Sequence, residues 1–307
     1  MHTQRLPAHS FLLRVIAIRP RDLFLLVGIT FIWGFNLITS KVGVGEIPPI
    51  LFTFLRFAVV AIVLMPVLRI QPGQMSAIVV AGLLSGALSF ALNFAALRRA
   101  SSVSSVAIAG QLSVPFATLL SVALLGEAVR WRRWTGIALS FVGVGIMGFD
   151  PQIGERWESL ALVVASAFVG ALGLIAVKKL RGFTPIELLA WTVWVGLPML
   201  LLTSLRVEQP DFAQLLHDVT WKGWASLAFA AVGASLIAHT GYFHLVQRYP
   251  VTSVAPLTTL SPVFSVIFGV MLLGDQLTGR ILMGGACTLL GVLIITLREK
   301  RIVDTGS

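Results

Sequence analysis

The sequence predicts an all-α integral membrane protein of ten transmembrane helices, built as a 5+5 inverted repeat, with the N and C termini cytoplasmic. Three observations predict this fold class. Apolar residues make up 57% of the 307 residues and charged residues 12%, against about 45–50% and about 25% in soluble proteins. Ten segments are apolar over nearly the length of about 20 residues that crosses a bilayer. Part of the chain also matches itself after a shift of 148 residues.

The expected helices follow one another along the chain with short connections. The first apolar run follows four arginines, as in a secretory signal peptide, but it is long enough to span and nine more runs follow. We therefore expect an uncleaved first helix. The longest connection, from Arg206 to Lys222, carries three acidic residues and is expected to be a surface loop. The expected spans are 22–40, 47–68, 75–97, 101–125, 134–149, 158–177, 185–204, 223–246, 251–273 and 281–297.

The distribution of charge indicates how the chain lies in the membrane. With the N-terminus in the cytoplasm, 15 Lys and Arg lie in inner segments, seven in outer segments and one, Arg56, within a span. This bias follows the positive-inside rule, so the net charge of +10 is a topology signal. Nucleic-acid binding would need the cations on one face and is not expected. The predicted parts are a cytoplasmic N-terminal segment 1–21, a first repeat 22–150, a second repeat 158–298 and a cytoplasmic tail 299–307.

Metal, cofactor and catalytic sites are not expected. The single cysteine, Cys287, forms no intramolecular disulfide and offers no zinc-binding spacing. The GxGxxG pattern at 143–148 lies within a span and follows no strand, so its glycines are expected to allow close packing instead of binding a dinucleotide. Ser235 and His239 lie one turn apart on one helix, which favours a packing or cavity pair over a hydrolase. An intramembrane enzyme remains a minor alternative.

The internal repeat is densest where the fourth and fifth spans match the ninth and tenth. Leu-Leu-Gly-Glu at 124–127 aligns with Leu-Leu-Gly-Asp at 272–275, and Gly136 aligns with Gly284. Because each half has five helices, an odd number, the second copy enters the membrane in the opposite orientation. Inverted repeats are a recurrent plan of secondary transporters, and two similar halves supply the two states of similar energy that alternating access requires. Duplication for packing alone is the alternative.

Three short motifs resemble the EamA-type branch of the drug/metabolite transporter superfamily. They are Trp-Gly-Phe-Asn at 33–36, Pro48-Pro49 followed by Leu-Arg-Phe at 55–57, and the Gly-Glu and Gly-Asp helix ends. The resemblance covers residues 22 to 298. It implies a ten-helix basket around a central cavity lined by the first, third, fourth, sixth, eighth and ninth helices. It also implies export of amino acids or related metabolites, with most similarity to exporters of cysteine-pathway metabolites.

Polar side chains inside the spans are few, and such groups usually face a bundle interior or a watery cavity. Several share a helix face, such as Trp33 and Asn36 on the first helix. For the Ser and Thr positions, hydrogen-bonded helix packing is the favoured alternative, whereas the larger amides favour a cavity. The predicted substrate contacts are Trp33, Asn36, Asn93, Gln111, His239, Tyr242 and Thr259.

Two residues are candidates for proton coupling, which the sequence leaves open. His239 lies deep in the eighth span, and histidine changes its protonation near neutral pH. A neutral, hydrogen-bonded interior histidine is the alternative. Glu187 lies in the first turn of the seventh span, where a carboxylate suits the helix dipole. Facilitated export needs neither residue.

Arg56 is the one cation deep in a span, about 13 Å from the outer end of its helix. It either attracts a substrate carboxylate or holds a helix junction, and the structural role is favoured because the resembled fold has the second helix at its periphery. Glu127 and Asp275 are expected to be helix-end anchors or gate-side ion pairs, and the prolines to kink helices or act as hinges. Structural or gating roles are thus predicted for Arg56, Glu127, Asp275, Pro115, Pro256 and Pro262.

The sequence thus predicts a multi-pass secondary transporter of the bacterial inner membrane that exports small metabolites, most of all amino acids or derivatives, by alternating access. The alternatives are a nucleotide-sugar, lipid-precursor or drug carrier, and third an intramembrane enzyme or a channel. The predicted partners are a small-molecule substrate and the lipid bilayer, without nucleic acid. The complete pseudo-symmetry predicts that a monomer is sufficient, alone or in a weak homo-oligomer.

Overall fold

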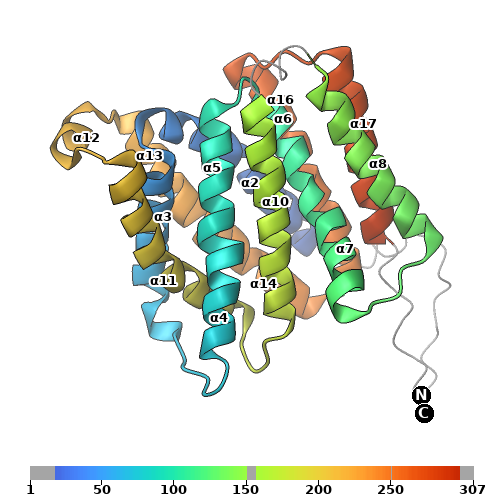
Figure 1. The fold of residues 1–307 in the computed structure, drawn as a ribbon, viewed down its shortest axis with the longest axis horizontal. Coiled ribbons are helices and arrows are strands. Elements are labelled where there is room, and N and C mark those ends of the chain that lie inside the picture. Colours follow the sequence, from blue (N-terminus) through green and yellow to red (C-terminus); the bar gives the residue numbers. More distant parts are fainter. Residues whose placement is uncertain (1–17, 151–156, 250, 298–307) are drawn as a thin grey trace.

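The computed structural model describes residues 18–150, 157–249 and 251–297, and this part of the chain forms helices and no strand (Figure 1). The predicted segments 1–21 and 299–307 fall almost entirely outside the described residues, so their cytoplasmic location stays a prediction. The helices of the first half are α2 (Pro20–Glu46), α3 (Pro49–Leu64), α4 (Met75–Gly82), α5 (Ser89–Arg99), α6 (Val103–Ala109), α7 (Ser113–Leu125) and α8 (Trp131–Gly148).

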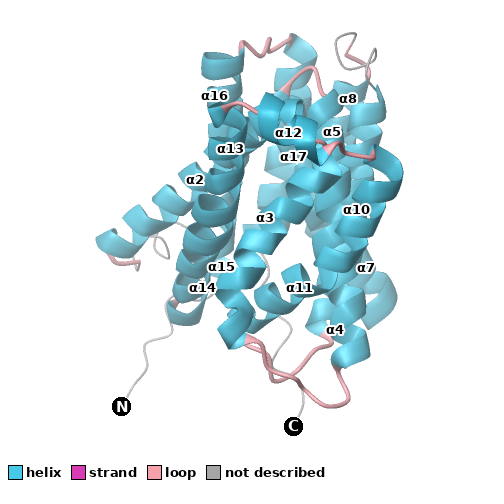
Figure 2. Ribbon diagram, turned by 90° about the vertical axis from the view of Figure 1, so that its left-hand side faces the viewer, coloured by secondary structure: helices cyan, strands magenta, loops and turns pink. Residues whose placement is uncertain are grey.

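The second half repeats this succession with one additional short helix. Its helices are α10 (Trp157–Lys178), α11 (Pro185–Thr203), α12 (Phe212–Asp218), α13 (Trp221–Ala228), α14 (His239–Arg248), α15 (Val251–Val254), α16 (Leu260–Leu273) and α17 (Gly279–Leu297). The connection expected to be a plain surface loop contains α12, which begins where the Asp211 carboxylate accepts from the amides of Ala213 and Gln214. Figure 2 shows α12 at one end of the bundle.

Nine helical stretches of the described residues are long and apolar enough to cross a membrane. Nine of the ten predicted spans each fall on one of them, which confirms an all-helical, membrane-spanning chain. The other predicted span, 134–149, falls on α8, which is helical but is not among the nine. Its first turn contains Arg132 and Arg133, so the apolar part of this helix is short. A tenth span therefore stays a prediction.

Several spans that the sequence predicts as continuous α-helices change their winding midway. The fourth is interrupted by the 3-10 turn Gly110–Leu112 and the ninth by the 3-10 turn Ala255–Thr259. The third and eighth contain the π-helical segments Leu83–Leu88 and Phe229–Ala238. Wider π turns inside α-helices are often found at functional sites, and changes at corresponding places in the two halves direct attention to these four helices.

Helices α8 and α17 pack side by side through glycines (Figure 1). A Cβ added at Gly143 would collide with the carbonyl oxygen of Gly284, and one added at Gly284 would collide with the carbonyl oxygen of Gly143. Gly136 and Gly291 meet in the same reciprocal way. Because only glycine permits this approach, Gly143 of the GxGxxG pattern is a close-packing residue, as expected from the sequence. A Cβ at Gly145 would meet nothing within 4 Å, so the expectation of close packing is not met at that position.

Corresponding helices of the two halves also end alike. Gly126 after α7 has φ 68° and Gly274 after α16 has φ 70°, the left-handed conformation that suits glycine at a helix C-terminus. In each half the next residue, Glu127 or Asp275, donates its amide to a carbonyl six residues earlier, at 3.3 Å and 3.0 Å. The repeated sequence motif therefore forms the same local structure twice.

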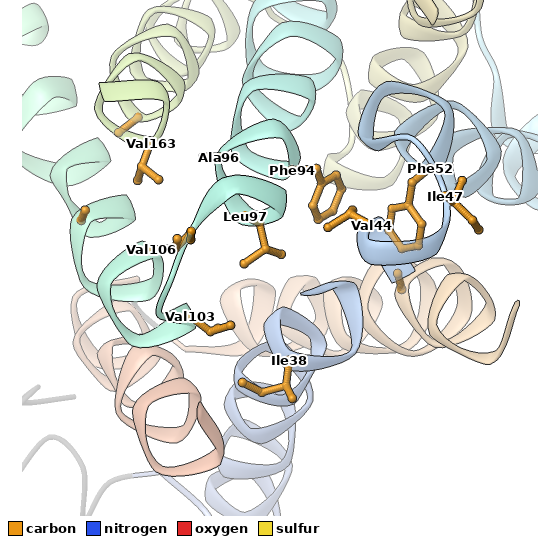
Figure 3. Close-up of a cluster of buried hydrophobic side chains, with 14 of the residues drawn as sticks. Ile38, Val44, Ile47, Phe52, Phe94, Ala96, Leu97, Val103, Val106 and Val163 are labelled. Carbon is orange, nitrogen blue, oxygen red and sulfur yellow. The ribbon is translucent and has the colours of Figure 1, made fainter. Parts of the chain in front are cut away.

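A cluster of buried apolar side chains fills one end of the bundle, where α2 ends, α3 begins, α5 ends and α6 begins (Figure 3). The rings of Phe52 and Phe94 meet edge to face with centroids 5.3 Å apart. Polar contacts close the same end: the Lys41 Nζ donates to the carbonyls of Leu97 and Ala100, both at 2.7 Å. Apolar packing and the capped terminus of α5 thus hold these four helix ends together.

Candidate functional site

Three of the predicted substrate contacts form one aromatic cluster between α2 and α14. The Trp33 ring lies 5.1 Å from the His239 ring and 5.4 Å from the Tyr242 ring, centroid to centroid. Trp33 Nε1 and His239 Nδ1 both donate to the carbonyl of Ala234, at 3.3 Å and 2.6 Å. Two helices far apart in sequence are thereby joined at one carbonyl. The cluster occurs at the end of the π-helical segment Phe229–Ala238.

Two side chains of this helix bond carbonyls within the π-helical segment. In a π turn the backbone bond joins residues five apart instead of four, and the His239 ring bonds the carbonyl five residues before it. The Ser235 hydroxyl likewise donates to the carbonyl of Ala230, at 3.0 Å. Apolar periodicity in the sequence gave no sign of this winding, because every residue from Phe229 to Ala234 is apolar or glycine.

Arg56 lies inside the bundle, with 3% of its surface exposed. Its Nε donates to the Ser235 hydroxyl at 2.9 Å, and its guanidinium carbon lies 5.2 Å from the centre of the Phe90 ring and 5.7 Å from that of Phe94. The resemblance implies a peripheral second helix, and from that helix this side chain reaches α5 and the eighth helix. Phe90 and Phe94 were not identified from sequence, since a Phe pair four residues apart is typical of any apolar helix.

The predicted amides differ in how the structure satisfies them. The Asn36 Oδ1 is buried without a hydrogen-bond partner among the described residues, as is the Ser40 Oγ one turn further along α2. Half-buried Asn93 and Gln111 likewise find no hydrogen-bonding residue in the described chain. A buried acceptor left without a donor costs about 1–3 kcal/mol. Amide groups that the protein does not satisfy are available to a ligand.

Gln111 and Thr259 occupy corresponding places in the two interrupted spans. Gln111 lies in the turn Gly110–Leu112, and Thr259 ends the turn Ala255–Thr259 and donates its hydroxyl to the carbonyl of Pro256 at 2.6 Å. The prolines that follow or form these turns, Pro115, Pro256 and Pro262, are all buried. Proline removes a backbone donor, which agrees with helices that change winding here.

The predicted acidic residues lie at helix ends. Glu187 and Thr184 form a capping box at the start of α11, with the Thr184 amide donating to Glu187 Oε2 at 2.7 Å, and Arg69 lies 3.4 Å from the same carboxylate. Asp275 is buried and its Oδ2 accepts from the Ser104 amide at 2.8 Å and hydroxyl at 2.7 Å. It therefore holds the start of α6.

Glu127 has a different environment from Asp275, its counterpart in the repeat. Its side chain is 46% exposed and its Oε1 lies 3.4 Å from the Nζ of Lys178, which also donates to the Ser121 hydroxyl at 3.0 Å. The two residues have the same local backbone structure, but the Asp275 carboxylate is buried and the Glu127 carboxylate is exposed. The two halves of this structure are not related by full symmetry.

An apolar hollow lies outside this region. It is an open groove of about 640 Å³ between α7 and α10, lined by apolar side chains that include Phe116, Trp157 and Phe168. None of the predicted binding residues lines it. No group of three or more His, Cys, Asp or Glu able to hold a metal occurs among the described residues.

The two halves also match a known family separately. The model of the EamA-like transporter family matches residues 21–149 and again residues 156–297. The chain belongs to the EamA-like transporter family. The resemblance seen in the sequence motifs is therefore confirmed, and the protein is a membrane transporter.

Full-length relatives support the same family. The chain is similar to proteins named "Probable amino-acid metabolite efflux pump" from Salmonella typhimurium, at 28% identity over 89% of this chain and 94% of the relative, and from Escherichia coli K12, at 26% identity over 94% and 99%. An uncharacterised transporter of Bacillus subtilis is 23% identical over 90% of this chain and 97% of its own. A solved crystal structure covers 91% of the chain and 98% of its own, with a TM-score of 0.61 at 19% identity, which supports the fold of this EamA-like chain.

Proposed function

We propose that this EamA-like chain is a secondary transporter of the bacterial inner membrane that exports amino acids or their derivatives. In this proposal ten helices form two inverted repeats of five, which rock about a central site and open it alternately to each side. The names of the Salmonella and Escherichia relatives support the substrate class and the direction. The family and these relatives are transporters, which argues against an enzyme.

The observation that carries the proposal is the reciprocal contact of α8 with α17. Gly136 meets Gly291 and Gly143 meets Gly284, and 284 and 291 are 136 and 143 shifted by the repeat length of 148. Gly136 thus contacts the repeat counterpart of Gly143, and Gly143 contacts the repeat counterpart of Gly136. Such reciprocal contacts mean that the two helices are related by a two-fold axis. The two helices are antiparallel, since the contacts run in opposite directions along them. A two-fold axis in the membrane plane relates inverted repeats, and so this contact supports them.

The proposed central site comprises the aromatic cluster of Trp33, His239 and Tyr242 with the amides of Asn36 and Asn93. Rings provide apolar surface and unsatisfied amides provide hydrogen bonds, a combination that suits small amphipathic metabolites. The asymmetry between buried Asp275 and exposed Glu127 supports two alternative arrangements of the halves. For proton coupling we retain His239 as the first candidate, because the capping box and Arg69 already occupy Glu187.

Counterflow in proteoliposomes tests the proposal. Purified protein is reconstituted, vesicles are loaded with one unlabelled L-amino acid at a time, and entry of the labelled form is followed. We expect saturable, transient accumulation for a subset of amino acids. Non-saturating flux would instead indicate a channel. Counterflow of nucleotide sugars, lipid precursors or drugs without counterflow of amino acids would contradict the substrate class and leave a carrier of another kind.

A further inference from the structure

The buried guanidinium of Arg56 is bound by few groups of the protein. It offers five N–H donors, and one of them, on Nε, bonds the Ser235 hydroxyl. The Nη1 and Nη2 donors have no hydrogen-bond partner among the described residues. What lies against them is the pair of aromatic rings of Phe90 and Phe94.

No carboxylate of the described residues forms an ion pair with Arg56. The ion pairs present join Arg69 to Glu187, Lys178 to Glu127, His217 to Asp218 and Arg248 to Asp22. Buried Asp275 is bound by the Ser104 hydroxyl and amide. Removing an ion from water costs more free energy than a cation–π contact returns. The protein alone therefore leaves the charge of Arg56 largely uncompensated.

The surroundings of Arg56 connect it to the aromatic cluster. Ser235, its hydrogen-bond partner, directly follows Ala234, whose carbonyl binds Trp33 and His239. Asn36, with its buried and unpartnered Oδ1, lies one turn after Trp33 on α2. Helix α2, which carries Asn36, and helix α3, which carries Arg56, both pack against the π-helical segment Phe229–Ala238. A cation without an anion and an acceptor without a donor thus lie on two helices that contact the same segment.

We propose that Arg56 binds the carboxylate of the transported molecule through its Nη1 and Nη2 groups, and that Asn36 Oδ1 accepts from the ammonium group of the same molecule. A planar guanidinium matches a carboxylate with two parallel hydrogen bonds. The substrate class is accordingly free α-amino acids, and amines, amides and esters are poor substrates. This inference rests on the proposed function and changes the favoured role of Arg56 from structural to substrate-binding.

The test compares each standard L-amino acid with its own carboxamide, which keeps the side chain and the ammonium group and removes the carboxylate charge. Binding is measured as the rise in unfolding temperature of the detergent-purified protein, because a ligand that binds the folded state stabilises it. Inorganic phosphate serves as a competing anion. We expect at least one amino acid to stabilise the protein, its carboxamide to bind about 30-fold more weakly, and phosphate to have little effect.

Three variants assign the effect to Arg56. Arg56→Gln should bind the acid and the carboxamide equally, and Arg56→Lys should keep part of the preference for the acid because it keeps the charge. The matched control is Arg98→Gln, at an exposed position near the end of α5, which should bind like the unmodified protein. If Arg56→Gln does not purify as a monodisperse protein, the role of Arg56 is tested by comparing how the unmodified protein and Arg56→Lys bind the acid and the carboxamide. A preference for the acid that does not weaken in Arg56→Lys would then contradict the role.

The outcomes for the inference and for the proposed function are separate. Four results would each overturn the inference. The unmodified protein could bind acid and carboxamide equally, or no amino acid could stabilise it. Phosphate could stabilise the protein more strongly than any amino acid, or the preference for the acid could persist in Arg56→Gln. Carboxylate-dependent binding without counterflow would support the inference and contradict transport. Equal counterflow of amino acids and their carboxamides would support transport and contradict carboxylate binding by Arg56.

Discussion

Ser140 on α8 and Thr288 on α17 donate to each other's backbone: the Ser140 hydroxyl reaches the carbonyl of Thr288 at 3.4 Å, and the Thr288 hydroxyl reaches the carbonyl of Ser140 at 3.4 Å. The two residues are 148 positions apart, the length of the sequence repeat. The local two-fold axis of this helix pair therefore passes between them. Glycines on either side keep the helices close enough for both bonds.

This interface predicts that a single methyl group destabilises the protein at one glycine and not at its neighbour. Gly143→Ala places a Cβ against the Gly284 carbonyl and the Thr288 side chain, whereas a Cβ at Gly145, on the same helix, meets nothing within 4 Å. We expect Gly143→Ala to lower the free energy of unfolding by about 1–3 kcal/mol and Gly145→Ala to leave it nearly unchanged. Thermal unfolding in detergent measures both, and equal effects would contradict the close packing.

Asp275 is expected to stabilise the start of α6. Its Oδ2 accepts three hydrogen bonds, from the hydroxyls of Ser102 and Ser104 and from the Ser104 amide. Asp275→Ala leaves these buried donors unsatisfied and should cost about 2 kcal/mol of stability. The matched control is Glu127→Ala, since exposed ion pairs contribute less than about 1 kcal/mol. Chemical denaturation compares the two variants, and a larger loss for Glu127→Ala would refute the assignment.

His239 is expected to carry any pH dependence of transport. Its ring is fixed by Trp33 and by the carbonyl of Ala234, and protonation would place a charge beside that cluster. His239→Ala should therefore flatten the dependence of the counterflow rate on pH, while His244→Ala, at an exposed position of the same helix, should not. A pH profile that survives in a properly folded His239→Ala variant would eliminate this role.

Water is expected to reach the unsatisfied amides. In a Cys287→Ala background, cysteines at positions 36, 93 and 111 should react with a water-soluble, membrane-permeant thiol reagent, and bound amino acid should slow the reaction. A cysteine replacing Val142, whose side chain is exposed on the outside of α8, is the matched control that substrate should not protect. Inertness at all three amide positions would argue against a cavity there.

The sequence was sufficient for features that depend on composition and local pattern. Low charge and long apolar runs require lipid as the solvent, because backbone groups in hydrocarbon must be satisfied inside each helix. The repeated Gly-Glu and Gly-Asp ends predicted two similar helix termini, and Gly126 and Gly274 have the same left-handed conformation. Of the α8 glycines expected to pack closely, Gly143 meets the backbone of α17, whereas Gly145 faces open space. Short motifs suggested the EamA-like family, and the family model that matches residues 21–149 and 156–297 confirms it.

Only the tertiary structure decided which distant side chains meet. The sequence showed Arg56 as an isolated cation, and it could not show that Ser235, Phe90 and Phe94 surround it, because helices in lipid have similar apolar faces all round and periodicity does not specify their partners. It also missed the π winding at Phe229–Ala238 and the bonds of Trp33 and His239 to the Ala234 carbonyl within that segment. Hydrophobicity determined that the chain crosses the membrane, and the pairing of helix faces determined where its few polar groups come together.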